Sequence, residues 1–238
     1  MKFFLFILIL FTVFIGSNTY SFSPWISYTT LDMEAVNYEY QRSYDDLNNY
    51  GVTTDLVKFS NALTFGIDLS MFRIEYMNVS PLKFTYSFII DYTEELQSSL
   101  TMGLIGFKIP DTYESKINIG IYAGGCVASI NRIITTKLGT NEQRAEIPYS
   151  GSDIIGEFDL EFKILEEPMI LNIGYRYAKV AEMKVSKDVD TNNDGTIDYK
   201  QGEIFKDRNG NPLIFDYSGI VISIGMKFGS KPKYEFEK

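Results

Sequence analysis

The chain has 238 residues, of which 45% are hydrophobic and 15% aromatic, and it carries a net charge of −9 at pH 7. This apolar content is enough for one folded domain and excludes an intrinsically disordered chain. An acidic chain without clustered Lys and Arg is a poor nucleic-acid binder. The absence of histidine excludes His-dependent catalytic triads and imidazole metal ligands.

Residues 1–21 are typical of a secretory signal peptide. Lys2 precedes an apolar run from Phe3 to Gly16, and small polar residues follow up to Ser21. A run of about 14 apolar residues suits a signal peptide and is short for a membrane-spanning helix. We expect cleavage after Ser21; cleavage after Ser17 and an uncleaved N-terminal anchor are the alternatives.

From residue 22 onward, apolar and polar side chains alternate with a period of two, which predicts β-strands. The clearest strand alternates Ile220, Ile222 and Ile224 with polar or small residues. The phase slips near residue 71, where no Gly, Pro or Asn marks a turn, so we interpret residues 60–78 as one strand with a bulge. The expected strands number eight: 25–33, 60–78, 82–92, 98–109, 115–128, 153–165, 169–185 and 214–229.

The connections between these strands differ in length at the two ends. Residues 78–81, 110–114 and 165–168 are short connections, whereas 34–59, 129–152 and 186–213 are long. Short periplasmic turns and long outer loops are typical of outer-membrane barrels. The sequence therefore predicts an all-β, eight-stranded antiparallel up-and-down transmembrane β-barrel over residues 22–229. A flexible charged tail is expected at 230–238, and weak helical character around 33–47.

Alternation alone does not decide which face points outward. In a membrane barrel the apolar face contacts lipid, whereas in a soluble lipocalin-like barrel it encloses a hydrophobic ligand. The polar face mixes glycines with long charged side chains, which favours a narrow lumen. Trp25, Tyr92, Tyr177 and Phe228 lie toward strand ends, as interfacial aromatic belts require.

The N-terminal segment, the eight alternating strands and the final strand ending at Phe228 together resemble the small outer-membrane barrels of the OmpA, OmpX and OmpW kind. The resemblance implies the outer membrane of a Gram-negative-type bacterium, with outer-membrane lipid and the insertion machinery as partners. Such barrels commonly end on an aromatic residue, whereas here ten residues follow Phe228 in the chain of 238. The resemblance leaves the oligomeric state open.

Residues 190–198 are similar to the calcium loops of EF-hands and dockerins. Oxygen-bearing side chains at alternate positions converge on a hard cation, and glycine at the sixth position permits the sharp turn. The twelfth position holds Gln201 instead of Glu, and Glu203 or Asp188 is the candidate substitute. A plain turn-rich surface loop is the alternative. The candidate Ca²⁺ ligands are Asp190, Asn192, Asp194, Thr196, Asp198 and Glu203.

Charged residues on the polar faces of the strands are candidates for a lumen network. A carboxylate-only catalytic site is the alternative interpretation, but buried charges need opposite partners, which favours a network. We therefore expect a non-enzymatic outer-membrane protein, either a structural or adhesive barrel or a narrow porin-like channel. The alternative class is a soluble periplasmic lipocalin-like binder. The network candidates are Asp68, Arg73, Glu75, Glu157, Asp159, Glu161, Lys163, Arg176 and Lys227.

Overall fold

The computed structural model describes residues 22–32, 59–69, 71–87, 89–109, 116–163, 169–207 and 209–228. Within these ranges no helix is long and apolar enough to span a membrane. The expected signal peptide, the helical character around 33–47 and the tail at 230–238 lie outside the described residues. The strands are β1 (Phe22–Asp32), β2 (Phe59–Leu69), β3 (Phe72–Ser87), β4 (Asp91–Ile109), β5 (Ile117–Leu138), β6 (Asn141–Lys163), β7 (Met169–Val180), β8 (Lys184–Val185), β9 (Phe215–Asp216) and β10 (Gly219–Met226).

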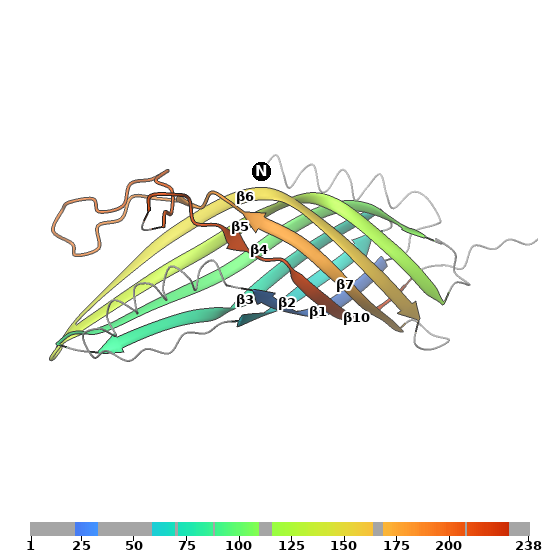
Figure 1. Ribbon diagram of the computed structural model, residues 1–238, viewed down its shortest axis with the longest axis horizontal. Coiled ribbons are helices and arrows are strands. Elements are labelled where there is room, and N and C mark those ends of the chain that lie inside the picture. The colour runs from blue at the N-terminus through green and yellow to red at the C-terminus, as the bar shows by residue number, and fades with distance from the viewer. Residues whose placement is uncertain are drawn as a thin grey trace, which may run out of the picture.

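Eight of these strands form a closed antiparallel ring in the order β1, β2, β3, β4, β5, β6, β7 and β10 (Figure 1). The ring closes where β1 pairs with β10, from Trp25 opposite Gly225 to Leu31 opposite Gly219. Reciprocal backbone hydrogen bonds between Phe22 and Phe228 extend this seam. The predicted all-β, eight-stranded up-and-down barrel is therefore confirmed.

The sequence analysis missed one turn and predicted another where the strand in fact continues. The expected single strand 60–78 is wrong, because β2 ends at Leu69 and β3 starts at Phe72, directly opposite it. The expected turn at 78–81 is also wrong, because β3 continues through it with a register shift between Val79 and Leu82. The strand count is still right, since one missed turn offsets one turn too many.

The predicted outer loop at 129–152 is wrong as well. β5 and β6 stay paired to a tight turn after Leu138, with Leu138 opposite Asn141. Pairing of β2 with β3 already stops at Ala62 and Val79, so β3 to β6 continue beyond the ring as an open four-stranded sheet. We call this end the hairpin end and the end bearing Phe22 and Phe228 the terminal end; the hairpin end lies at the left of Figure 1.

The outer surface of the ring carries exposed apolar side chains, because the period-two face of each strand points outward. On β5 this face changes at one level: Ile119, Ile121 and Val127 are exposed and apolar, whereas Ser129, nearer the hairpin end, is polar. The other strands contribute exposed aliphatic and aromatic side chains at the same level. This apolar belt includes Ile26, Tyr28, Leu63, Phe65, Ile67, Ile74, Tyr76, Ile105, Phe107, Phe158, Ile173, Tyr175, Ile220, Ile222 and Ile224.

The interior has two chemically different halves. Toward the terminal end it is lined by buried charged and amide side chains, whereas toward the hairpin end it is lined by residues such as Leu100, Met102 and Ile130. The segment between β7 and β10 folds onto the apolar half. Its Phe205 stacks on Tyr149 of β6 with ring centroids 4.6 Å apart, and it lies tilted against Phe215 with centroids 5.6 Å apart. Charge thus occupies one end of the barrel, and a packed core fills the other.

Candidate functional site

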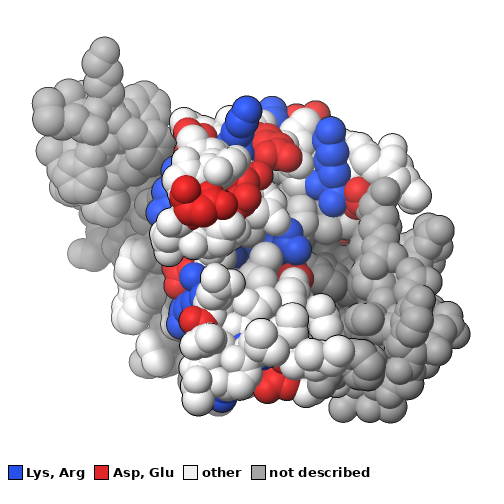
Figure 2. Space-filling model, turned by 90° about the vertical axis from the view of Figure 1, so that its left-hand side faces the viewer, with Lys and Arg blue, Asp and Glu red and all other residues white. Residues whose placement is uncertain are grey.

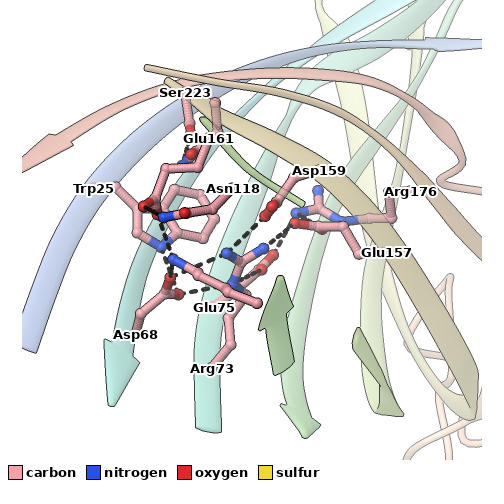
Figure 3. A network of polar contacts seen from close by, with 12 residues as sticks. Trp25, Asp68, Arg73, Glu75, Asn118, Glu157, Asp159, Glu161, Arg176 and Ser223 are labelled. Atoms are coloured by element: carbon pink, nitrogen blue, oxygen red, sulfur yellow. Dashed lines mark hydrogen bonds and ion pairs between the residues drawn. The ribbon is translucent and has the colours of Figure 1, made fainter. Parts of the chain in front are cut away.

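The charged half of the interior is built mainly from the β2–β3 hairpin and from β6 and β7. Asp68 and Arg73 stand opposite each other across the β2–β3 turn, so their side chains share the inner face. On β6, Glu157, Asp159 and Glu161 follow at every second residue and point the same way. The structure therefore brings the predicted carboxylates and arginines into one interior space (Figure 3).

Arg73 lies at the centre of this space, and its side chain is 1% exposed. Its Nε is 2.7 Å from Asp68 Oδ1, its Nη2 is 2.8 Å from Asp159 Oδ2, and its Nη1 donates to Glu157. The guanidinium also lies over the ring of Tyr122, 3.9 Å from the centroid. A single arginine thus connects carboxylates of β2 and β6 from its place on β3.

Arg176 makes the second set of contacts and is fully buried. Its Nε donates to Glu157 Oε2 at 2.9 Å, and its Nη2 contacts Glu75 Oε2. In the ring order β7 and β3 stand four places apart among eight, so Arg176 and Glu75 project from opposite walls. Their contact therefore bridges the whole width of the interior.

Lys108 and Asn118 complete the network although the sequence analysis did not select them. Lys108 Nζ is 3.0 Å from Asp68 Oδ2 and also contacts Glu161, which accepts a 2.8 Å hydrogen bond from Asn118 Nδ2. The sequence contained a signal for Lys108, because it lies on the inner face of β4, between the exposed Phe107 and Ile109.

Trp25 was expected at a lipid interface, and this prediction is wrong. Its side chain points inward, is 6% exposed, and donates from Nε1 to Asp68 Oδ1 at 3.1 Å. The ring has room because Gly66 faces it: a Cβ at Gly66 would lie 2.1 Å from the indole. The missing side chain of the glycine on β2 thus makes room for the tryptophan on β1. This depends on the pairing of two strands, so the pattern of one strand alone does not predict it.

Lys163 and Lys227 lie at the edge of this network, toward the terminal end. Both are on the inner faces of their strands and half-buried. The two lysines repel one another, and Lys227 attracts the Glu161 carboxylate. They place positive charge at the terminal mouth of the barrel, beyond the arginine contacts.

The network's groups are positioned to neutralise one another. Each arginine is shared among carboxylates, and within the described ranges no group of three or more His, Cys, Asp or Glu side chains is arranged to hold a metal ion. Three carboxylate oxygens, Glu75 Oε1 and both of Asp159, accept no hydrogen bond from the described residues, although Asp159 Oδ2 lies within ion-pair distance of Arg73. The arrangement suits mutual charge pairing better than acid–base work on a substrate.

The candidate calcium loop lies in the segment between β7 and β10, at the hairpin end. Asp190 Oδ2 accepts the backbone N–H of Gly195 at 2.8 Å, which folds the first and sixth positions together. A hydrogen bond from the backbone N–H of Thr196 lowers the pKa of Asp194. The Thr191 hydroxyl likewise lowers the pKa of Asp198. These contacts define the fold of the loop, and calcium binding stays a prediction.

Comparisons with known proteins give distant structural similarity only. No family model and no curated protein matches the chain. Among solved structures, Ail, the attachment invasion locus protein of Yersinia pestis, here in complex with the heparin analogue sucrose octasulfate, is 8% identical; the match covers 89% of this chain and 100% of Ail, with a TM-score of 0.39.

Two further solved structures are similar to the chain at the same level. The outer membrane protein OprG from Pseudomonas aeruginosa is 12% identical, with 90% of this chain and 99% of OprG covered and a TM-score of 0.39. Neisserial surface protein A is 11% identical, with 90% and 98% covered and a TM-score of 0.32. At these values the similarity assigns neither a ligand nor an activity to this chain.

The class of protein follows from the chain's own geometry. A closed antiparallel ring, an apolar belt on its outer surface and paired charges inside are the architecture of a small transmembrane β-barrel.

Proposed function

We propose that this chain is a non-enzymatic outer-membrane protein with a closed interior and a structural or adhesive role. The observation that carries the proposal is the pair of arginine bridges across the lumen. Arg73 and Arg176 connect β3 to β6 and β7 to β3, and both side chains are almost completely buried. A barrel whose opposite walls are joined by buried ion pairs has no open polar path at that level.

The direction of the apolar face supports a membrane location over the soluble lipocalin-like alternative. A lipocalin would enclose its apolar side chains and expose charge, whereas here Ile222 and Phe65 are about half exposed and Glu75 is buried. Removing apolar surface from water is worth about 25 cal/mol per Å². A continuous exposed belt is therefore strongly unfavourable in water and favourable in lipid.

The packed apolar half supports a closed barrel over the narrow channel. The segment between β7 and β10 places Phe205 and Tyr217 against the inner surface of the β4–β6 sheet, and the Tyr217 hydroxyl lies 2.7 Å from Ser98 Oγ. A solute entering from the hairpin end would have to displace this segment before it reached the charged half. Outer-membrane lipid and the insertion machinery are the partners that we propose, and the role requires no cofactor.

Conductance across planar lipid bilayers tests the proposal. We expect the purified, refolded full-length chain to insert and to show no ion current above the lipid background. Deleting residues 186–212 while retaining the arginines should leave the bilayer silent as well, because the lumen bridges remain. Steady single-channel current through the intact protein would contradict the closed barrel and favour the porin-like alternative. Recovery of the protein in water without detergent would contradict the membrane location.

A further inference from the structure

The extreme hairpin end carries an apolar tip that the barrel itself does not use. The β3–β4 turn presents Ile89 and Ile90, which are 75% and 44% exposed, and the end of β5 presents Leu138, which is 55% exposed. Asp91 pairs with Lys137, so the two turns lie side by side, as the converging strands at the left of Figure 1 show. Turns are ordinarily built from Gly, Asn, Asp, Pro and Ser. Three exposed aliphatic side chains at these turns are therefore unusual and indicate a binding role.

The tip is rigid and far from the apolar belt. Continuous pairing holds β4 and β5 together from Ile109 opposite Ile119 up to Asp91 opposite Lys137. Just below the turn, Tyr86 of β3 stacks on Tyr92 with ring centroids 4.8 Å apart. The aliphatic side chains are thus held away from the barrel's own membrane on a braced four-stranded sheet.

We propose that this tip, formed by Ile89, Ile90 and Leu138, inserts into the surface of a second lipid bilayer opposite the one that holds the barrel. This proposal rests on the proposed adhesive role and names its partner. Three side chains are far too few for a stable protein–protein interface, which needs about 800 Å² from each partner. Insertion into a bilayer surface has no such minimum, because binding grows with each apolar group buried.

The residues around the tip fit the interfacial zone of a membrane. Tyr86 and Tyr92 lie directly behind the aliphatic side chains, in the order in which tyrosines border apolar segments at lipid head groups. Asp91, Lys137 and Glu142 occupy paired positions at the tip, so its net charge is −1 and it has no positive excess that would attract anionic lipid. Figure 2, which views this end, shows larger patches of charged side chains over its upper part and smaller ones among white surface below. The chemistry therefore fits a zwitterionic lipid surface.

Flotation of barrel-loaded nanodiscs with vesicles tests the proposal. The full-length protein is inserted into nanodiscs and mixed with phosphatidylcholine vesicles, and bound protein is measured after a density gradient. We expect binding that does not weaken when salt is raised, and at least a tenfold loss for the combined variant Ile89→Ser, Ile90→Ser and Leu138→Ser. The control, Ile197→Ser with Ile214→Ser, removes two isoleucines of the neighbouring loop segment that are as exposed as Ile90, and it should bind as the unmodified chain does.

The outcomes separate the two proposals. Inserted barrels that do not float with vesicles, or a triple variant that floats as well as the unmodified protein, would overturn the docking proposal while leaving the membrane barrel intact. Binding restricted to anionic vesicles and abolished by salt would also overturn it, because charge would then be responsible. Failure of the full chain to insert into nanodiscs would contradict both proposals. Heat-dependent gel migration establishes that the triple variant still folds.

Discussion

Replacing Arg73 with methionine tests whether the lumen network is essential for stability. The substitution keeps much of the side-chain volume and removes the charge that contacts Asp68, Glu157 and Asp159. Asp68 keeps Lys108 and Glu157 keeps Arg176, so these two carboxylates remain partnered. Asp159 loses Arg73, whose Nη2 lies 2.8 Å from Asp159 Oδ2. Among the described residues, Arg73 is the ion-pair partner of Asp159.

The expected change in the free energy of unfolding follows from the lost partner of Asp159. Removing one member of a buried ion pair costs about 3–5 kcal/mol, because the other charge stays buried without a partner. We therefore expect Arg73→Met to lower the free energy of unfolding by about this amount, a change in the unfolding equilibrium of roughly two to three and a half powers of ten. Urea unfolding in phospholipid vesicles measures it, with the single tryptophan, Trp25, as the reporter inside the network.

The control and the rescue make the test specific. Arg144 pairs with Glu146 at 2.8 Å, but their side chains are 57% and 52% exposed. Arg144→Met should therefore cost less than about 1 kcal/mol. Adding Asp159→Asn to Arg73→Met removes the unpartnered charge and should restore part of the lost stability. Equal effects of the two arginine variants, or further destabilisation by Asp159→Asn, would refute the reasoning.

The remaining predictions concern the barrel wall, the covering segment and the loop. Gly124→Ala should destabilise the barrel by at least about 1 kcal/mol, because a Cβ there would lie 2.0 Å from the Gly103 carbonyl oxygen, whereas Gly103→Ala meets open space and should be tolerated; urea unfolding compares them, and equal tolerance would contradict the contact. Phe205→Ala should cost about 3–5 kcal/mol of the local packing and make residues 181–218 sensitive to protease while the barrel stays resistant; unchanged digestion would show that the stack does not hold the segment. We expect the 190–198 loop to bind Ca²⁺ in isothermal titration calorimetry and the combined variant Asp190→Asn, Asp194→Asn to lose the signal; a silent titration of the unmodified protein favours the plain turn.

The outward face of each strand was predictable because lipid imposes a simple rule on it. Every second residue of the final strand, from Ile220 to Ile224, is apolar and exposed, and a period of two is visible in any short window. The buried charges were visible for the same reason, since Glu157, Asp159 and Glu161 occupy the opposite phase. Which partners they contact depends on strands far apart in the chain, and local patterns carry no such information.

The errors have identifiable local causes. The connection between β2 and β3 contains no Gly, Pro or Asn, and the phase change between these strands is identical to that of a bulge. Pro81 then suggested a turn, although β3 accommodates it at a register shift. The apolar half of the interior was missed because the apolar face of each strand was expected to point outward, whereas Leu100, Met102 and Leu104 of β4 point inward.

The change of character along β5 has a consequence for where the protein can reside. Up to Val127 the outward side chains of β5 are apolar, whereas Ser129 is polar and exposed and the next residue, Ile130, is buried. The outer surface of the strand thus changes, within two residues, from one suited to lipid to one suited to water. A bilayer that is too thick would cover Ser129, and one that is too thin would leave Val127 in water, at a cost of fractions of a kcal/mol per Å. This boundary therefore limits how far the bilayer can extend along the barrel, and the protein should partition into bilayers whose thickness matches its apolar belt.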